Sequence, residues 1–165
     1  PMDSATYTAS SRLQASGLRS GITLFERAAT SVPLPRPPQP IAIADYGAAT
    51  GYNSLLPIGA AIAAIRARTR SDHAILVAHT DLPGNDFTAL FTTITEDQDS
   101  YLAKDAATFA SAVGRSFYQQ ILPSESIALG WSSWATHRLS RVPARSADHI
   151  HVAHSADEAA RRAYA

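Results

Sequence analysis

The chain has 165 residues, about the length of one domain, and its apolar content of 45% is that of an ordinary globular protein. Fourteen basic residues balance fourteen acidic ones, so neither nucleic acid nor a membrane surface is an expected partner. The absence of cysteine excludes disulfides and thiolate chemistry, and without a bilayer-spanning apolar run or a secretory signal pattern we expect a cytoplasmic protein.

The first 31 residues predict an arm followed by one helix. Apolar side chains recur at a ragged helical spacing between Ser10 and Ala29. Gly17 and Gly21 each cost such a helix about 1 kcal/mol relative to alanine, so tertiary contacts must support it. Residues 32–40 contain five prolines and can be neither helix nor central strand. We expect an extended, semi-rigid spacer there.

From residue 41 onward, short apolar runs alternate with helical segments. The expected strands span residues 41–44, 74–78, 109–113 and 126–131, the last two being the weaker candidates. The expected helices span residues 54–66, 87–93 and 156–165. This alternation predicts an α/β fold with a doubly wound, mainly parallel sheet. Because the last helix ends without cap, glycine or proline, we expect residues 41–165 to be a truncated domain.

A loop of small residues joins the first expected strand to the next helix. It runs from Ile43 to Ser54 and contains Asp45 in the spacing D-x-G-x-x-x-G. An open α/β sheet holds its ligand at such a loop, and Gly47 allows close approach of the backbone. The loop therefore predicts a ligand site, with a purely structural strand-to-helix turn as the alternative.

A second polar segment, Thr80 to Phe87, follows the second buried strand. Asp81 occupies the position at which an acidic residue binds ribose hydroxyls in nucleotide-binding sheets. A Pro-Gly turn followed by a helix cap at Asn85 or Asp86 is the structural alternative. Both interpretations can hold, because they use different residues.

These segments resemble motifs of the SABATH methyltransferases, which methylate small carboxylic acids or xanthine nitrogens. Residues 43–53 resemble the family's I-A-D-L-G-C-S-S-G-P-N, and residues 80–87 match N-D-L-P-G-N-D-F except at the first position. Weaker matches lie at residues 6–14, 115–118 and 131–143. The resemblance implies a Rossmann-like class I methyltransferase core. It covers only the N-terminal half of a family member, without the last strands and the helical cap.

The resemblance implies S-adenosylmethionine (SAM) as cofactor, S-adenosylhomocysteine (SAH) as product and a small carboxylic acid as substrate. The residues that it places around the cofactor are Tyr7, Asp45, Gly47, Ala48, Asn53, Asp81, Leu82, Ser116 and Phe117. Those that it places around the acid are Tyr7, Gln14, Trp134, His137 and Arg138. The arm would fold over the site. No catalytic acid or base is expected, and no convincing His–Asp dyad is visible, because the enzyme needs only to align the reactants and exclude water.

Arg138 is the main departure from the family, which usually has a tryptophan that contacts the substrate carboxylate. A guanidinium could bind the acid bidentately, or Arg138 could face solvent in a wider pocket. Methylation of a ring nitrogen or another heteroatom, and a non-catalytic cofactor-binding module, therefore remain alternatives. We expect the fragment alone to be inactive, a homodimer to be possible, and the histidines at 149, 151 and 154 to bind no metal.

Overall fold

The computed structural model describes residues 18–135, 140–145, 148–149 and 151–165. The described residues up to Ala135 form one compact unit, and those from 140 onward belong to a second. No helix among the described residues is long and apolar enough to cross a membrane. The boundaries expected at residues 31 and 40 remain predictions.

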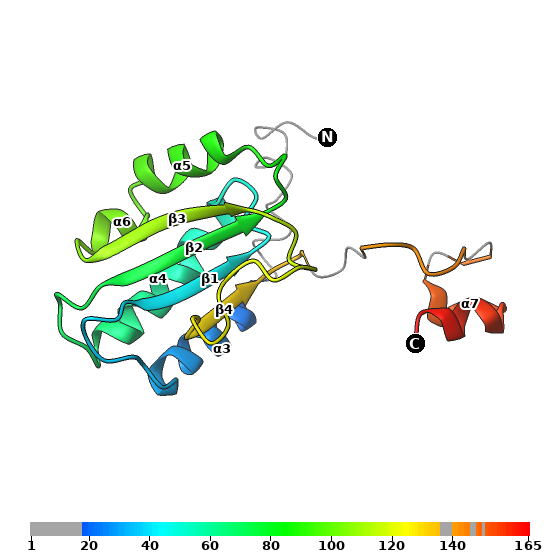
Figure 1. The fold of residues 1–165 in the computed structure, drawn as a ribbon, viewed down its shortest axis with the longest axis horizontal. Coiled ribbons are helices and arrows are strands. Elements are labelled where there is room, and N and C mark those ends of the chain that lie inside the picture. The colour runs from blue at the N-terminus through cyan, green and yellow to red at the C-terminus, as the bar shows by residue number, and fades with distance from the viewer. Residues whose placement is uncertain (1–17, 136–139, 146–147, 150) are drawn as a thin grey trace. The chain divides into compact units, whose positions relative to one another are not determined.

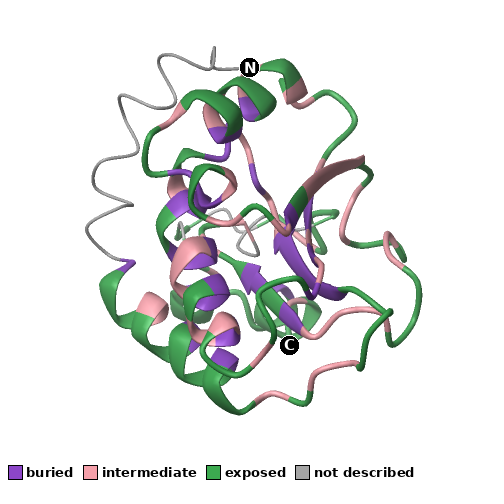
Figure 2. Ribbon diagram, turned by 90° about the vertical axis from the view of Figure 1, so that its left-hand side faces the viewer, coloured by how far each residue is buried: buried purple, intermediate pink, exposed green. Residues whose placement is uncertain are grey.

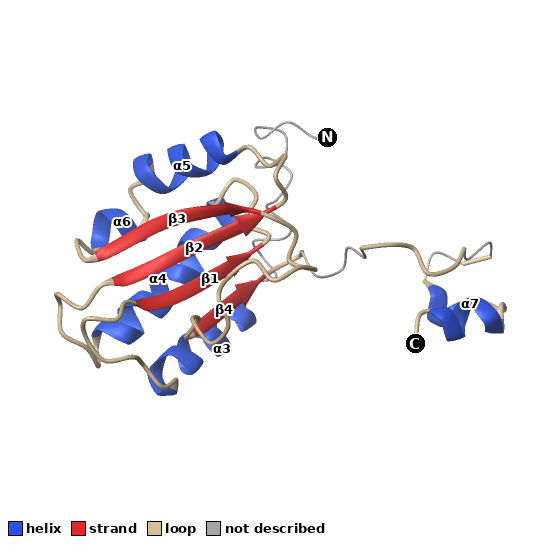
Figure 3. Ribbon diagram, in the orientation of Figure 1, coloured by secondary structure: helices blue, strands red, loops and turns tan. Residues whose placement is uncertain are grey.

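The first unit is built on a four-stranded parallel sheet (Figures 1 and 3). Its strands are β1 (Ile41–Tyr46), β2 (Ile75–Asp81), β3 (Thr108–Gly114) and β4 (Leu129–Ser132), in the order β3-β2-β1-β4. The chain adds β2 and β3 on one side of β1 and then returns to the other side with β4. The strand order therefore reverses between β1 and β4, and open α/β sheets bind ligands at the carboxyl ends of strands beside such a reversal.

Four helices accompany the sheet: α3 (Arg19–Ser31), α4 (Tyr52–Arg66), α5 (Phe87–Glu96) and α6 (Tyr101–Lys104). In Figure 1, α3 and α4 lie behind the strands. Figure 2 shows the sheet from its side, with the helices of this unit gathered on one face. Within the described residues, β3 is joined to β4 by a loop that contains no helix.

Burial explains why these residues form strands. β1 is buried along its first five residues, and Ile41, Ile43, Ile75 and Val77 are completely buried. Both β1 and β2 have a hydrogen-bonded neighbour on each side, and most of their residues are buried. The prediction of a parallel α/β sheet from these runs is confirmed.

Helix α3 depends on packing, as Gly21 predicts. Phe25 of α3 lies against Trp131 of β4, with the ring centroids 5.2 Å apart. At Gly21, a Cβ atom would lie 3.3 Å from the Trp131 ring, so the missing side chain makes room for the indole. Arg68 binds the end of α3 by donating hydrogen bonds of 2.9 Å to the carbonyls of Ala29 and Val32.

The other expected elements are present with shifted ends. Helix α4 begins two residues before the expected Ser54, and α5 extends three residues beyond the expected end at 93. Strand β4 begins only at Leu129, where its pairing with Ile43 of β1 begins, and Ser126 instead donates its hydroxyl to the Pro123 carbonyl at 2.7 Å. Helix α6 was not predicted. Of the first expected helix, residues 10–17 lie outside the described part of the chain.

The second unit contains a short 3₁₀ turn, η1 (Val152–His154), and helix α7 (Glu158–Ala163). Asp157 caps α7 by accepting hydrogen bonds from the backbone of Ala159 and Ala160. The rings of His149 and His151 lie 5.2 and 5.3 Å from that of His154. Among the described residues of either unit, no group of three or more side chains is suited to hold a metal ion.

Candidate functional site

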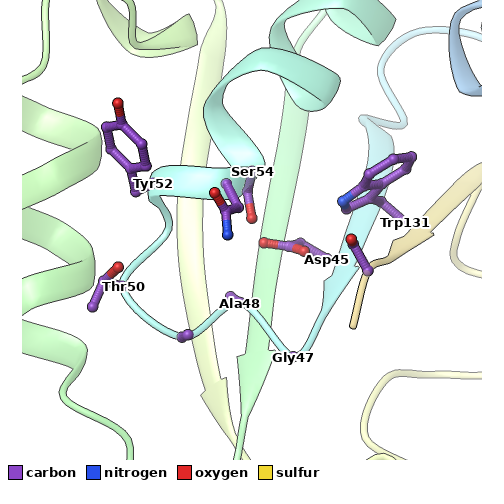
Figure 4. Close-up of a pocket in the computed structure, with 10 residues that line it drawn as sticks. Asp45, Gly47, Ala48, Thr50, Tyr52, Ser54 and Trp131 are labelled. Carbon is purple, nitrogen blue, oxygen red and sulfur yellow. The ribbon is translucent and has the colours of Figure 1, made fainter. Parts of the chain in front are cut away.

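A pocket lies where the strand order reverses, at the carboxyl ends of β1 and β4 (Figure 4). The space between its lining atoms, counted out into the open solvent, is about 390 Å³. Its lining comes from the end of β1, the following loop, the first turn of α4, and β4 with Ser133. The lining residues are Asp45, Gly47, Ala48, Ala49, Thr50, Tyr52, Asn53, Ser54, Trp131 and Ser133.

The loop between β1 and α4 has the backbone conformation that its glycines allow. Gly47 and Gly51 have φ angles of +83° and +79°, in the left-handed region, and Ala49 has a φ of 49°. The N–H groups of Gly47 and Ala48 donate to the Thr80 carbonyl at 2.8 and 3.1 Å. The loop is therefore held against the end of β2, and these two N–H groups are already engaged.

Asp81 holds the same loop through its side chain. The N–H of Ala49 donates to Asp81 Oδ2 at 2.8 Å, and the N–H of Leu82 donates to Oδ1 at 2.7 Å. Each carboxylate oxygen has a further lone pair, so these bonds leave room for ribose hydroxyls. Asn85 also binds the loop, because its Nδ2 donates to the Ala49 carbonyl at 2.8 Å. The expected cap of α5 is Asp86, which accepts from Ala89 at 2.9 Å.

Asp45 lies in the middle of a row of three side chains that crosses the sheet. His79 of β2 is its neighbour in register on one side, and Trp131 of β4 is its neighbour on the other. Asp45 is 2% exposed, His79 is fully buried and Trp131 is 8% exposed. Figure 4 shows the Asp45 carboxylate pointing toward Ser54 at the start of α4 and the indole nitrogen of Trp131 facing the pocket. The N-terminus of a helix favours a nearby negative charge.

His79 joins Asp45 to α6. Its Nδ1 lies 2.8 Å from Asp45 Oδ2, and its Nε2 lies 2.7 Å from the Tyr101 hydroxyl. The expectation that the chain has no His–Asp dyad is therefore wrong. The two residues are 34 positions apart, and only the register of β1 against β2 places them side by side.

Asn53 contributes a buried acceptor at the pocket. Within the described residues its Oδ1 has no hydrogen-bond partner. A buried polar atom left in this way is destabilising unless a ligand or water satisfies it. Together with the Asp45 carboxylate, the pocket offers acceptors for a ligand that carries hydrogen-bond donors, such as an ammonium group.

The structure brings together four of the predicted cofactor residues, namely Asp45, Gly47, Ala48 and Asn53. Other predicted site residues lie outside this pocket's lining: Asp81, Leu82, Ser116, Phe117 and Trp134. Leu82 is 55% exposed and Trp134 is 52% exposed, the latter with a positive φ of 57°. Ser116 and Phe117 follow β3, whose last residue, Gly114, pairs in register with Asp81. Four predicted residues lie outside the described part of the chain: Tyr7, Gln14, His137 and Arg138.

Eight residues at or beside the pocket were not predicted as site residues: Ala49, Thr50, Tyr52, Ser54, Trp131, Ser133, His79 and Tyr101. Trp131 and Ser133 lie in the weak match at 131–143, and β4 brings them beside β1. For His79, its place between the expected strand at residues 74–78 and Asp81 was the only available indication.

The sequence was compared with known families and proteins. The profile of a family described as SAM dependent carboxyl methyltransferase matches residues 2–165. The methyltransferase FUS9 of Gibberella moniliformis is 35% identical over 144 residues, which cover 86% of this chain and 39% of the relative. A benzoic acid/salicylic acid carboxyl methyltransferase of Petunia hybrida is 31% identical, with coverage of 64% and 32%.

Among solved structures, a loganic acid methyltransferase with SAH is similar to this chain, with a TM-score of 0.70 and 26% identity. The match covers 87% of this chain and 41% of the other. The chain thus spans about two fifths of the length of FUS9 and of the loganic acid enzyme.

Proposed function

We propose that this chain, which belongs to the family of SAM-dependent carboxyl methyltransferases, is the cofactor-binding part of an enzyme that methylates the carboxylate of a small organic acid. The observation that carries the proposal is the pocket at the strand reversal, where Asp45 and Asn53 present acceptors beside a loop with the family's first motif. The fold and the family profile point to the same ligand.

The residues around the pocket fit SAM by the chemistry of their groups. The aminoacyl end of SAM carries an ammonium group, for which Asp45 and the unpartnered Asn53 Oδ1 are suitable acceptors. Asp81, with spare lone pairs at the end of β2, is placed for ribose hydroxyls. Leu82 is half-exposed beside it, and Ser116 with Phe117 follows the neighbouring strand end, where they would close the adenosine pocket.

The protein's own contribution is to bind, to orient and to exclude water. SAM supplies a methyl group already activated by a positively charged sulfur, and a carboxylate is already ionised at neutral pH. A general base is therefore unnecessary. Alignment of two bound reactants can lower a barrier by roughly 7–11 kcal/mol. In the proposal, Tyr7, Gln14, Trp134, His137 and Arg138 bind the acid, by the family resemblance.

A small carboxylic acid as the substrate is supported by the relatives. The names of the Petunia and loganic acid enzymes each state an acid. Because this chain spans only part of their length, the acid itself is not assigned. A homodimer and a cytoplasmic location are further parts of the proposal.

The test is a methyl-transfer assay with SAM labelled on its methyl group. The complete protein is incubated with a panel of small organic acids and, as controls, their amides and xanthines. Label released as a base-labile methyl ester of an acid supports the proposal. Label found only on nitrogen would contradict the proposal and favour the nitrogen-methylating alternative. SAH binding without transfer to any acceptor would favour a non-catalytic module.

A further inference from the structure

Asp45, His79 and Tyr101 form a buried chain of hydrogen bonds that leads from the pocket to α6. Their exposed fractions are 2%, 0% and 1%. The two links measure 2.8 Å, between Asp45 Oδ2 and His79 Nδ1, and 2.7 Å, between His79 Nε2 and the Tyr101 hydroxyl. The two rings are stacked, with centroids 6.1 Å apart and an angle of 23° between their planes. Packing and hydrogen bonds thus restrain every member of the chain.

The partners determine where the protons lie. Burial raises the pKa of the Tyr101 phenol, and the negative charge of Asp45 adds to this effect. The hydroxyl therefore stays protonated and can donate to His79 Nε2, which lies at hydrogen-bond distance. In the tautomer with Nε2 as acceptor, the ring proton lies on Nδ1, which then donates to Asp45. The Tyr101 O–H and the His79 Nδ1–H then both point in the direction that leads from α6 to the Asp45 carboxylate.

Only one oxygen of the Asp45 carboxylate is used in this way. His79 binds Oδ2, and no described residue donates to Oδ1. Asp45 also lines the pocket, where the second acceptor is Asn53 Oδ1. The carboxylate can rotate about a soft terminal torsion, and the bond to the imidazole restricts that rotation. His79 therefore determines which oxygen faces the ligand.

We propose that His79 and Tyr101 are positioning residues that hold Asp45 so that its second carboxylate oxygen accepts a hydrogen bond from the ammonium group of SAM. This inference rests on the proposed function, because it concerns the aminoacyl end of the same cofactor. A merely structural role, in which the buried side chains join β2 to α6, predicts equal effects on every part of the ligand. The positioning role predicts an effect on the aminoacyl end alone.

The experiment uses two ligands that share the adenosine and sulfur atoms. SAH carries the aminoacyl end, whereas 5′-methylthioadenosine lacks it. Both dissociation constants are measured by titration calorimetry on the complete protein, and the melting temperature of each variant is recorded. The ratio of the two dissociation constants isolates the contribution of the aminoacyl end, because damage to the adenosine site changes both constants by the same factor.

Four variants are compared. His79→Leu removes the donor to Asp45, and Tyr101→Phe removes only the hydroxyl that fixes the imidazole tautomer. His79→Asn keeps an N–H donor at the position of Nδ1 but does not reach Tyr101. His73→Leu is the matched control, because His73 is also buried and makes one bond, to the Gln39 carbonyl, at the opposite end of β2.

We expect His79→Leu to weaken SAH binding by about tenfold or more and to leave 5′-methylthioadenosine binding within about twofold. Tyr101→Phe should act in the same direction with a smaller effect, and His79→Asn should restore most of the SAH affinity. His73→Leu should lower the melting temperature without changing the ratio.

Two results would overturn the inference while leaving the proposed function intact. One is an equal loss of affinity for both ligands in His79→Leu. The other is an SAH affinity of His79→Asn no better than that of His79→Leu, which would show that the donor to Asp45 is unimportant. If His79→Leu does not fold, Tyr101→Phe is compared with wild type instead, and an equal loss of affinity for SAH and 5′-methylthioadenosine in Tyr101→Phe would overturn the inference. Failure of the folded wild type to bind either ligand would instead refute the proposed function, and the inference with it.

Discussion

The backbone N–H of Ala49 donates a hydrogen bond of 2.8 Å to Oδ2 of Asp81, which links the loop after β1 to the end of β2. Sequence motifs suggest a single task for Asp81, the binding of ribose. In the structure the carboxylate also holds the glycine loop in place, with the help of Asn85 and the Thr80 carbonyl. One side chain thus couples the shape of the loop to the proposed cofactor site.

Replacing Asp81 with alanine should weaken SAH binding by ~1–3 kcal/mol, the usual loss for a hydrogen bond to a charged group. The loss has two sources, the acceptor for ribose and the anchor of Ala49. Titration calorimetry measures it. Asp99→Ala is the control, because the side chain of Asp99 is 89% exposed and forms an ion pair only with Lys104. Equal SAH affinity in wild type and Asp81→Ala would remove Asp81 from the site.

Two glycine substitutions should change stability in opposite directions. Gly51→Ala should lower the free energy of unfolding by about 1–3 kcal/mol, because Gly51 has a φ of +79° and a Cβ there would lie 2.7 Å from Leu90 Cδ1. Gly59, inside α4, has open space around it, so Gly59→Ala should raise stability by about 0.5–1 kcal/mol. Urea denaturation of the two variants checks both signs. A Gly51→Ala variant as stable as wild type would contradict the left-handed turn.

The ion pair between Arg66 and Asp105 should make the free energy of unfolding depend on pH. Arg66 donates from Nε and Nη2 to the two carboxylate oxygens, and these bonds hold the pKa of Asp105 below its usual range. The folded-state pKa is depressed, so the stabilisation is complete above the unfolded value of about 4 and is lost as the pH falls through the lower folded value. Asp105→Ala should therefore cost roughly 1.5–3 kcal/mol at pH 7.

Urea denaturation as a function of pH measures this difference between Asp105→Ala and wild type. The two curves should converge as the pH falls below about 4. A constant difference from pH 7 down to strong acid would show that Asp105 stabilises the fold by packing instead of charge.

A fourth prediction concerns Arg138, which lies outside the described residues. If it binds the substrate carboxylate in place of the family's tryptophan, Arg138→Ala should raise KM for the acid by about tenfold and leave SAH affinity unchanged. Arg138→Trp should keep some acid methylation. Arg141→Ala is the control, because Arg141 is an exposed arginine three positions further along the sequence. Identical kinetics for wild type and Arg138→Ala would mean that Arg138 faces solvent.

Short sequence patterns predict much of this fold because each helix and strand is one continuous segment of the chain. The runs that begin at Ile41 and Ile75 are continuous apolar segments, which is typical of buried strands in parallel sheets, and both are central strands. Helix α6 has only four residues, too few to show a helical period, and it follows a cap at Ser100 that is itself buried. The start of β4 is set by pairing with β1, and no local pattern contains that information.

The site could be predicted only where its residues are neighbours in sequence. Asp45, Gly47 and Asn53 lie in one loop, so a single motif identifies them together. His79 and Trp131 flank Asp45 only because β2 and β4 pair with β1 in a particular register. A shift of one residue would turn each of these side chains to the other face of the sheet. The sequence alone therefore could not reveal the row of side chains in which Asp45 lies.

The central claim is that SAM occupies the pocket between Asp45 and the first turn of α4. The most direct test is a crystal structure of the complete protein with SAH. We expect electron density for the aminoacyl end beside Asp45 and Asn53, and for the ribose beside Asp81. SAH bound elsewhere on the protein, with this pocket empty, would contradict the claim.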